Sequence, residues 1–396
     1  MYGLVLEGGG AKGSYQVGAY QAILDCGLEV KAISGTSIGA LNGAMIVQGD
    51  FKICRELWED ISYSKVINAN DEDIRRLRQL KLNIEDLRHL GVKLKDVISD
   101  RGLDITPFKN MLNEHVDESK IRESNIDFGI VTVNITDLRA IEIFKDDMPE
   151  GMIKDYLLAS AFLPVFKNER IGGKHYLDGG VYDNLPYKML SNKGYKNLII
   201  VRTHPGERTI IQDDTLNEVI VISPSDDIGR SFTYEKDISR KNIKLGYFDG
   251  LKAIRGYVGD NYYFYPEGDK YFVNLLYDLE DQRVEKLMDL FNVGNSNKKR
   301  ALFEDILPKI ASILDMNREN NYEDIMLGLF ERAMGRLKLE KFEIYRVDDI
   351  ISKFKSNDVF LTRHKDKTNG FLGRLESLSL KNKDEILAEV VSIMFM

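Results

Sequence analysis

The chain is organised around the stretch Ile33-Ser34-Gly35-Thr36-Ser37-Ile38-Gly39-Ala40-Leu41-Asn42-Gly43-Ala44. Residues 30–34 have the pattern of a short buried strand, and small and apolar residues recur at helical spacing from Gly39 onward. Between them lies Gly-x-Ser-x-Gly, in which a tight strand-to-helix turn presents a serine hydroxyl, here that of Ser37. Gly35 and Gly39 leave room for the turn, since a Cβ at either position would collide with its neighbours. The helix that begins at Ile38 directs its free N–H groups and positive dipole end toward whatever Ser37 attacks.

Composition limits the class of protein. The 396 residues are 43% hydrophobic and 30% charged, which is ordinary for a globular chain with one large domain and a smaller one. A net charge of −8 without a basic cluster argues against a nucleic-acid partner. Cys26 and Cys54 fit neither a disulfide framework nor metal-ligand spacing, and we expect no metal and no cofactor. No signal-peptide pattern and no apolar run of about 18 residues occur, so a soluble, cytoplasmic protein is expected.

A second glycine cluster, Gly8-Gly9-Gly10-Ala11-Lys12-Gly13, lies between a predicted strand (2–6) and a predicted helix (14–26). Its spacing matches the dinucleotide fingerprint, which also requires an acidic residue where Ser34 and Gly35 stand. A Walker loop requires lysine after its last glycine, where Ser14 stands. We therefore expect no nucleotide, and interpret the loop as backbone N–H groups that hold an oxyanion beside Ser37. A tight turn without chemistry is the alternative.

A third motif, Asp178-Gly179-Gly180, ends a predicted strand that begins at His175. Further strands are predicted at 128–133, 140–144, 196–202 and 219–223. Their alternation with helices predicts a mainly parallel sheet covered on both faces. Catalytic groups in such sheets gather at the carboxyl ends of strands, where Ser37 is also expected. Asp178 is therefore a candidate base, although Asp-Gly-Gly is also an ordinary turn.

Four motifs, taken in order, resemble the patatin-like phospholipases. They are Gly8 to Gly13, Gly35 to Gly39, Ala159-Ser160 with Pro164, and Asp178 to Gly180 with Asn184 and Pro186; the stretch from Ile243 to Asp249 looks like a helix of the bacterial members. The resemblance covers about residues 3–190 and implies a three-layer α/β sandwich with a Ser-Asp dyad. It places the nucleophile at Ser37, the general base at Asp178 and the oxyanion loop at Gly8, Gly9 and Gly10. Supporting motif positions are Lys12, Gly13, Gly35, Gly39, Gly179 and Gly180.

The chemistry leaves a dyad and a triad open. A serine hydroxyl needs a base within hydrogen-bond reach. In the chain order of hydrolases a catalytic histidine follows the acid, which leaves His204 and His364 for a triad. If Asp178 acts alone, desolvation would raise its pKa toward a useful value. The N–H groups of the glycine loop and of Ile38 would then hold the oxyanion.

Beyond residue 265 the sequence predicts helices in series, at 276–291, 300–314, 323–339 and 384–396. We predict a catalytic domain over 1–265 and a C-terminal helical subdomain over 266–396. The terminal run from Ile386 to Met396 is apolar enough to touch a membrane surface, but burial as the last core helix is the better expectation. Asp71 to Gly91 is charge-rich and predicts a solvated surface helix, with a mobile lid as the alternative.

The predicted function is hydrolysis of carboxylic esters of lipids, of phospholipase A or lysophospholipase type, through an acyl-Ser37 intermediate. The expected partner is the lipid ester, with transient contact to a membrane surface. One alternative is a catalytically idle lipid- or partner-binding protein of the same fold, against which the intact Ser37, Asp178 and glycine loop argue. A thioesterase or acyltransferase is the other alternative.

Overall fold

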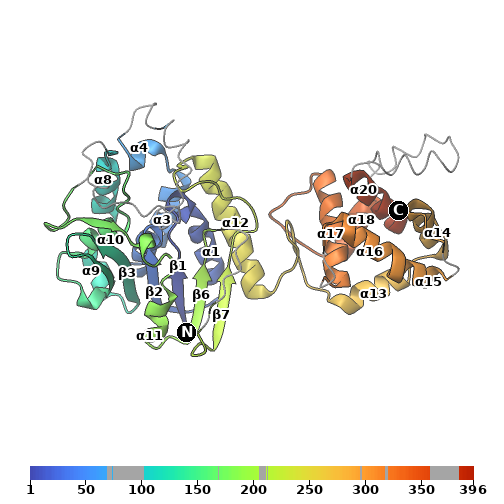
Figure 1. Ribbon diagram of the computed structural model, residues 1–396, viewed down its shortest axis with the longest axis horizontal. Coiled ribbons are helices and arrows are strands. Elements are labelled where there is room, and N and C mark those ends of the chain that lie inside the picture. The colour runs from blue at the N-terminus through green and yellow to red at the C-terminus, as the bar shows by residue number, and fades with distance from the viewer. Residues whose placement is uncertain are drawn as a thin grey trace. The chain divides into compact units, whose positions relative to one another are not determined.

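The computed structural model describes residues 1–68, 74, 102–167, 169–204, 211, 213–294, 297–316, 320–356 and 383–396. The chain forms two compact units, Met1–Arg255 and Gly256–Met396 (Figure 1). Residues just after Arg255 go with the second unit because β8 (Tyr263–Phe264) pairs with β9 (Ile344–Tyr345). Apart from residue 74, the predicted surface helix at 71–91 lies outside the described residues, and so does His364.

The first unit is built on a mainly parallel sheet, as predicted, with strand order β4-β3-β2-β1-β6-β7 and with β5 paired to β3. The strands are β1 (Tyr2–Leu6), β2 (Val30–Thr36), β3 (Asp127–Asn134), β4 (Arg139–Phe144), β5 (Tyr176–Asp178), β6 (Asn197–Val201) and β7 (Glu218–Ile222). Only β4 and β5 pair antiparallel, both with β3. Strands β1 and β6 are almost continuously apolar because helices cover them on both faces.

Helices cover both faces of this sheet, which confirms the expected three-layer α/β architecture. On one face α11 (Tyr187–Asn192) packs on β2, and its Leu190 joins Val5, Leu198 and Ile200 in a buried cluster. Side chains alternate along a strand, so Leu6 faces the opposite side, where α2 packs against β1. The other helices of this unit are α1 (Gly13–Asp25), α2 (Ile38–Val47), α3 (Phe51–Glu59), α4 (Tyr63–Val66), α8 (Thr106–His115), α9 (Glu118–Glu123), α10 (Ile153–Ser160) and α12 (Lys236–Arg255).

Helices α1 and α12 lie in close contact because both carry glycine at the crossing. A Cβ on Gly18 would overlap the carbonyl of Ile243, and a Cβ on Gly246 would overlap the carbonyl of Tyr15. The Tyr15 hydroxyl also donates a hydrogen bond to Asp249 Oδ2 at 3.0 Å. The stretch from Ile243 to Asp249, which the sequence analysis singled out, is therefore the part of α12 that packs against α1.

The second unit is helical, as predicted. It contains α13 (Asp269–Tyr277), α14 (Asp281–Phe291), α15 (Lys298–Arg300), the π-helical η4 (Ala301–Ile306), α16 (Leu307–Ile313), α17 (Tyr322–Arg336), α18 (Val347–Lys355) and α20 (Lys383–Phe395). The prediction of one helix over 276–291 was wrong, because α13 ends at Tyr277 and α14 begins at Asp281.

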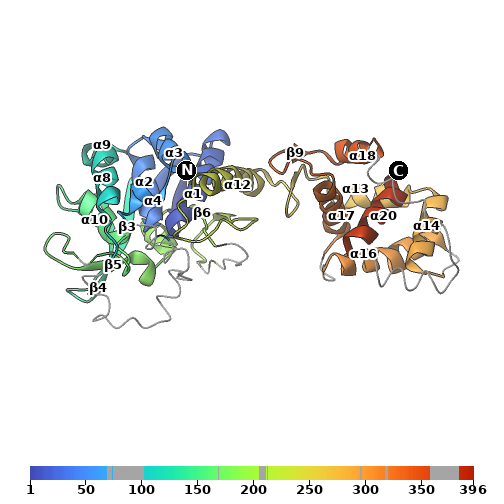
Figure 2. The same cartoon turned by 90° about the horizontal axis from the view of Figure 1, so that it is seen from above.

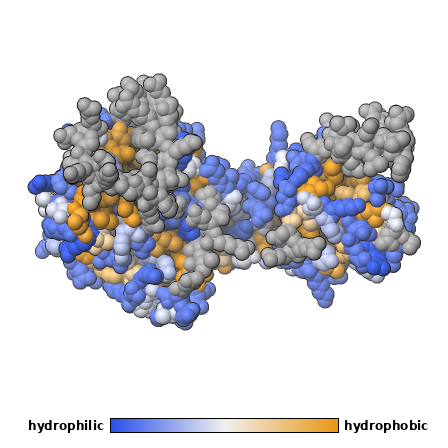
Figure 3. Space-filling view, viewed as in Figure 1, coloured by the Kyte–Doolittle hydropathy of each residue, from blue (hydrophilic) through white to orange (hydrophobic). Residues whose placement is uncertain are grey.

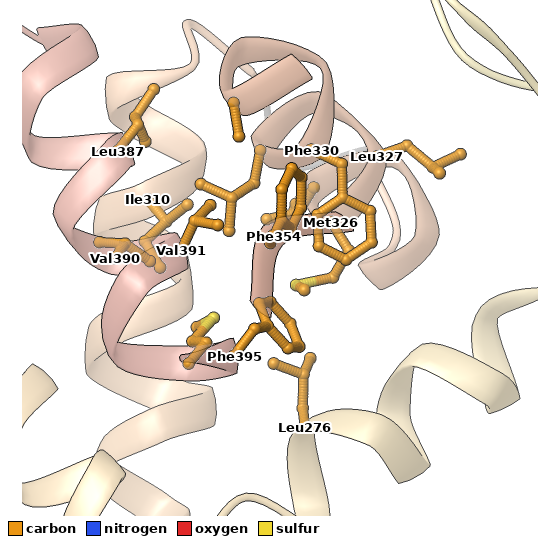
Figure 4. Close-up of a cluster of buried hydrophobic side chains, with 14 of the residues drawn as sticks. Leu276, Ile310, Met326, Leu327, Phe330, Phe354, Leu387, Val390, Val391 and Phe395 are labelled. Carbon is orange, nitrogen blue, oxygen red and sulfur yellow. The ribbon is translucent and has the colours of Figure 1, made fainter. Parts of the chain in front are cut away.

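Helix α20 is buried in the core of the second unit. This confirms the expectation of a last core helix and not the alternative of a segment that touches a membrane surface. It packs against α14, α16, α17 and α18 (Figure 2). Val391 and Phe395 of α20 gather with Ile310, Phe330 and Phe354 from three neighbouring helices (Figure 4). Apolar residues also reach the visible face of both units (Figure 3). None of the helices in the described ranges has both the length and the apolar character needed to cross a bilayer.

Candidate active site

Ser37 occupies the turn between β2 and α2. Its φ of 56° and ψ of −124° are unusual for a residue with a side chain, and such strain is typical of functional sites. The two flanking glycines make the turn sterically feasible. A Cβ on Gly35 would overlap the backbone of Gly39, and a Cβ on Gly39 would overlap the carbonyl of Leu6. The sequence therefore forms the predicted elbow, with Ser37 only 3% exposed.

The register of β3 brings Asp178 to Ser37. The last residue of β2, Thr36, pairs with Val131 of β3, and Asp178 of β5 pairs with the next residue, Thr132. Strand β5 thus continues the edge of β3 from the point where β2 ends, and Ser37 and Asp178 meet there. The chain then turns at Gly179, where a Cβ would overlap the carbonyl of Val131.

The carboxyl group of Asp178 is completely buried. Its Oδ1 accepts a hydrogen bond from the N–H of Gly180 at 2.8 Å, and its Oδ2 has no hydrogen-bond partner within the described structure. Burial raises the pKa of Asp178 to about 6, opposed by the nearby Ser37 hydroxyl and the Gly180 N–H. The Ser37 hydroxyl is thus close enough to stabilise the carboxylate, although no hydrogen bond of standard geometry joins the two side chains.

Ser160, at the end of α10, fixes the main chain of the elbow. The N–H of Ser37 donates to Ser160 Oγ at 2.9 Å, and that hydroxyl donates to the carbonyl of Val131 at 2.6 Å. Ser160 is fully buried, so neither bond competes with water. The sequence analysis singled out Ala159-Ser160 only through the family resemblance and predicted no role for Ser160. The contacts of Ser160 with Ser37 and Val131 join residues far apart in the chain, so local patterns do not reveal them.

Hydrogen bonds to the Gly8 carbonyl fix the orientation of the glycine loop. The carbonyl of Gly8 accepts hydrogen bonds from Thr203 Oγ1 at 2.7 Å and from Asn184 Nδ2 at 3.4 Å. Since the peptide unit is planar and trans, the N–H of Gly9 points away from Thr203. Gly8 was also predicted as a donor, but its N–H donates to the carbonyl of Asn184 at 3.1 Å and is not available to an oxyanion. The N–H groups of Gly9, Gly10 and Ile38 donate to no protein group in the part of the chain described. The loop therefore offers free donors, as an oxyanion hole requires.

A buried ionic cluster lies behind this loop. Glu7 Oε2 lies 3.0 Å from Arg202 Nε, 2.6 Å from the N–H of Thr203 and 3.2 Å from His204 Nδ1. Burial alone would raise the pKa of Glu7, but the bonds and charges of His204, Arg202 and Thr203 outweigh it and lower that pKa. His204, the candidate for a triad, is therefore engaged with Glu7, and no hydrogen bond joins it to Ser37 or Asp178.

The predicted site residues lie close together. Gly8 lies against Thr36, since a Cβ on Gly8 would be 3.3 Å from the Thr36 carbonyl, and Gly13 lies against Ile38. Lys12 is buried at the end of the short helix η1 (Gly10–Lys12). Within the described ranges, no cluster of three or more His, Cys, Asp or Glu side chains is arranged to hold a metal ion.

Residues 4–191 match the family model described as patatin-like phospholipase. Patatin-like phospholipase domain-containing protein 7 of Rattus norvegicus is 26% identical over 198 residues, which are 50% of this chain and 13% of that protein. Lysophospholipase NTE1 of Cryptococcus neoformans is 26% identical over 200 residues, 50% of this chain and 11% of that protein. The chain thus spans a small part of the length of these relatives.

Two solved structures are also similar. The crystal structure of VipD from Legionella pneumophila aligns with a TM-score of 0.39 at 15% identity, covering 100% of this chain and 91% of that one. The type III effector protein ExoU aligns with a TM-score of 0.33 at 15% identity, covering 98% of this chain and 76% of that one.

Proposed function

We propose, from the match of residues 4–191 to the patatin-like phospholipase family, that this chain hydrolyses carboxylic esters of lipids with Ser37 as nucleophile and Asp178 as general base. One observation carries this assignment: a serine on a strained turn meets a fully buried carboxylate whose second oxygen has no hydrogen-bond partner among the described residues. The names of these relatives support a phospholipid or lysophospholipid substrate.

In the first step Ser37 Oγ attacks the ester carbonyl carbon, and Asp178 Oδ2 takes the hydroxyl proton. A carboxylate with an ordinary pKa is a weak base for this transfer, and the raised pKa of about 6 makes it stronger while leaving it mostly ionised at pH 7. The hydrogen bond from Gly180 to Oδ1 holds the carboxyl group in place, so Oδ2 remains available for the proton.

The carbonyl oxygen becomes an oxyanion as the Oγ–C bond forms. The free N–H groups of Gly9, Gly10 and Ile38 are the donors proposed to stabilise it. Preorganised donors of this kind are each worth about 10²–10³ in rate, because they need no reorganisation as the charge appears. The Thr203 and Asn184 bonds to the Gly8 carbonyl keep this peptide unit oriented.

The tetrahedral intermediate then collapses. The carbon–oxygen bond to the alcohol breaks, and protonated Asp178 returns its proton to the leaving oxygen, which gives the free alcohol and acyl-Ser37. A water molecule next attacks the acyl carbon while Asp178 takes one of its protons. Collapse of the second intermediate releases the fatty acid and restores the Ser37 hydroxyl with that proton.

Labelling with a fluorophosphonate tests the nucleophile. We expect one labelled peptide, containing Ser37, and loss of both labelling and short-chain ester hydrolysis in Ser37→Ala with an unchanged melting curve. Ser64→Ala, at an exposed serine, is the matched control and should label normally. Labelling of another serine would contradict the assignment. A folded wild-type protein that neither labels nor hydrolyses would favour an idle binding protein.

A further inference from the structure

An apolar cavity of about 100 Å³ lies on the side of α2 that faces α3 and α8. Ile38, Leu41 and Met45 line it from α2, Trp58 from α3, and Phe108 and Met111 from α8. None of the reaction steps described above uses this cavity. Its first lining residue, Ile38, directly follows Ser37 in the chain.

Two polar side chains of the lining, Asn42 and Trp58, are hydrogen-bonded to each other. Asn42 Oδ1 accepts a hydrogen bond from Trp58 Nε1 at 2.9 Å, and Asn42 Nδ2 donates to the carbonyl of Gly13 at 2.9 Å. Burial raises the pKa of the Cys54 thiol to about 12, so this lining side chain stays uncharged. His115 and Tyr234 also contribute polar atoms to the lining, but most of the lining side chains are apolar, so a hydrocarbon chain would gain burial here.

The α2 residues that line the cavity follow the helix away from Ser37. Ile38, Leu41 and Met45 follow one another at helical spacing along α2, and Met45 lies roughly 10 Å along the axis from Ile38. Resting on the proposed function, we infer that this cavity receives the acyl chain of the ester that Ser37 attacks. Met45, Trp58, Phe108 and Met111 then limit the length of that chain.

The chain contains a single tryptophan, and it is Trp58. Its fluorescence therefore reports from the cavity alone and does not depend on catalysis. In Ser37→Ala protein, titration with 11-bromoundecanoic acid should quench Trp58 saturably, because bromine would reach the indole. Met111→Phe should weaken this binding about fourfold for each methylene it excludes, whereas Asn110→Phe, at an exposed position of the same helix, should not.

Kinetics on soluble esters with acyl chains of increasing length give the second readout. Met111→Phe should lower kcat/KM much more for long-chain esters than for the acetate ester. If Met111→Phe melts early, Phe108→Leu enlarges the cavity and should shift the preference toward longer chains. Absent Trp58 quenching, or an equal effect of Met111→Phe on every chain length, would overturn the inference. Failure of fluorophosphonate labelling would instead contradict the proposed function. Trp58 quenching would still show whether the cavity binds an acyl chain.

Discussion

At the scale of single residues, the buried carboxyl group of Asp178 lowers the free energy of unfolding when it is ionised. Asp178 is held with its pKa at about 6, above the 3.8 of an ordinary aspartate. Between these values the native protein binds a proton that the unfolded chain does not, so the free energy of unfolding falls as the pH rises from about 4 to 6. Above that range the buried carboxylate destabilises the fold by on the order of 3 kcal/mol.

The pH dependence of activity should follow the same group. Because Asp178 must be ionised to accept the Ser37 proton, kcat/KM should fall about tenfold per pH unit below about pH 6. Asp178→Asn should abolish hydrolysis and raise the melting temperature at pH 8 but not at pH 4. Steady-state rates and melting curves from pH 4.5 to 8.5 provide the measurement. A flat profile, or a loss of several orders of magnitude in folded His204→Ala, would argue against Asp178 as the sole base.

Thr203 is a positioning residue, since it acts on the oxyanion donors only through the Gly8 carbonyl. Thr203→Val removes the hydroxyl and keeps the shape, so the Gly8–Gly9 peptide loses its strongest orienting bond. We expect kcat to fall about 10-fold or more, with little change in Trp58 quenching by the bromo acid. Thr203→Ser should restore most of kcat. Equal losses in Thr203→Val and Thr203→Ser would point to a packing role instead.

At the scale of elements, short sequence patterns predict the turns whose geometry depends on steric contacts between nearby residues. The elbow around Ser37 and the glycine loop were predictable because each needs glycine where a Cβ would overlap the backbone or a neighbouring side chain. The pairing of Asp178 with Thr132 was not, because it depends on the register of two strands more than forty residues apart in sequence. The sequence placed Asp178 near Ser37 through a general property of strand ends and through the family resemblance, and neither specifies this register.

In the second unit, a regular spacing of apolar residues continues across the break between helices α13 and α14. Leu276, Leu279, Val284 and Leu287 are all buried in one core, so their spacing predicts a single helix. The chain nevertheless leaves the helix after Tyr277 and starts again at Asp281, with Leu279 reaching the same core from the connection. Periodicity identifies the buried face, and the ends of the helices depend on packing that the sequence does not display.

At the scale of the whole molecule, every group proposed for catalysis lies in the first unit. The elbow, the glycine loop, Asp178, Thr203 and the cavity all belong to Met1–Arg255. The second unit has its own core, in which α20 packs against four helices of the same unit. Each unit thus has a hydrophobic core built from its own residues, as independently folding domains do.

Residues 1–255 should therefore fold alone, label with fluorophosphonate at Ser37 and hydrolyse a short-chain ester at a rate within about threefold of the full chain. A matched truncation to 1–235 should fail to fold, because it removes α12, whose Ile243 and Gly246 contact α1. Melting curves, labelling and steady-state rates of the three proteins provide the measurement. If 1–255 melts cooperatively but no longer labels while the full chain does, the second unit contributes to the active site. That result would also explain why one chain contains both units.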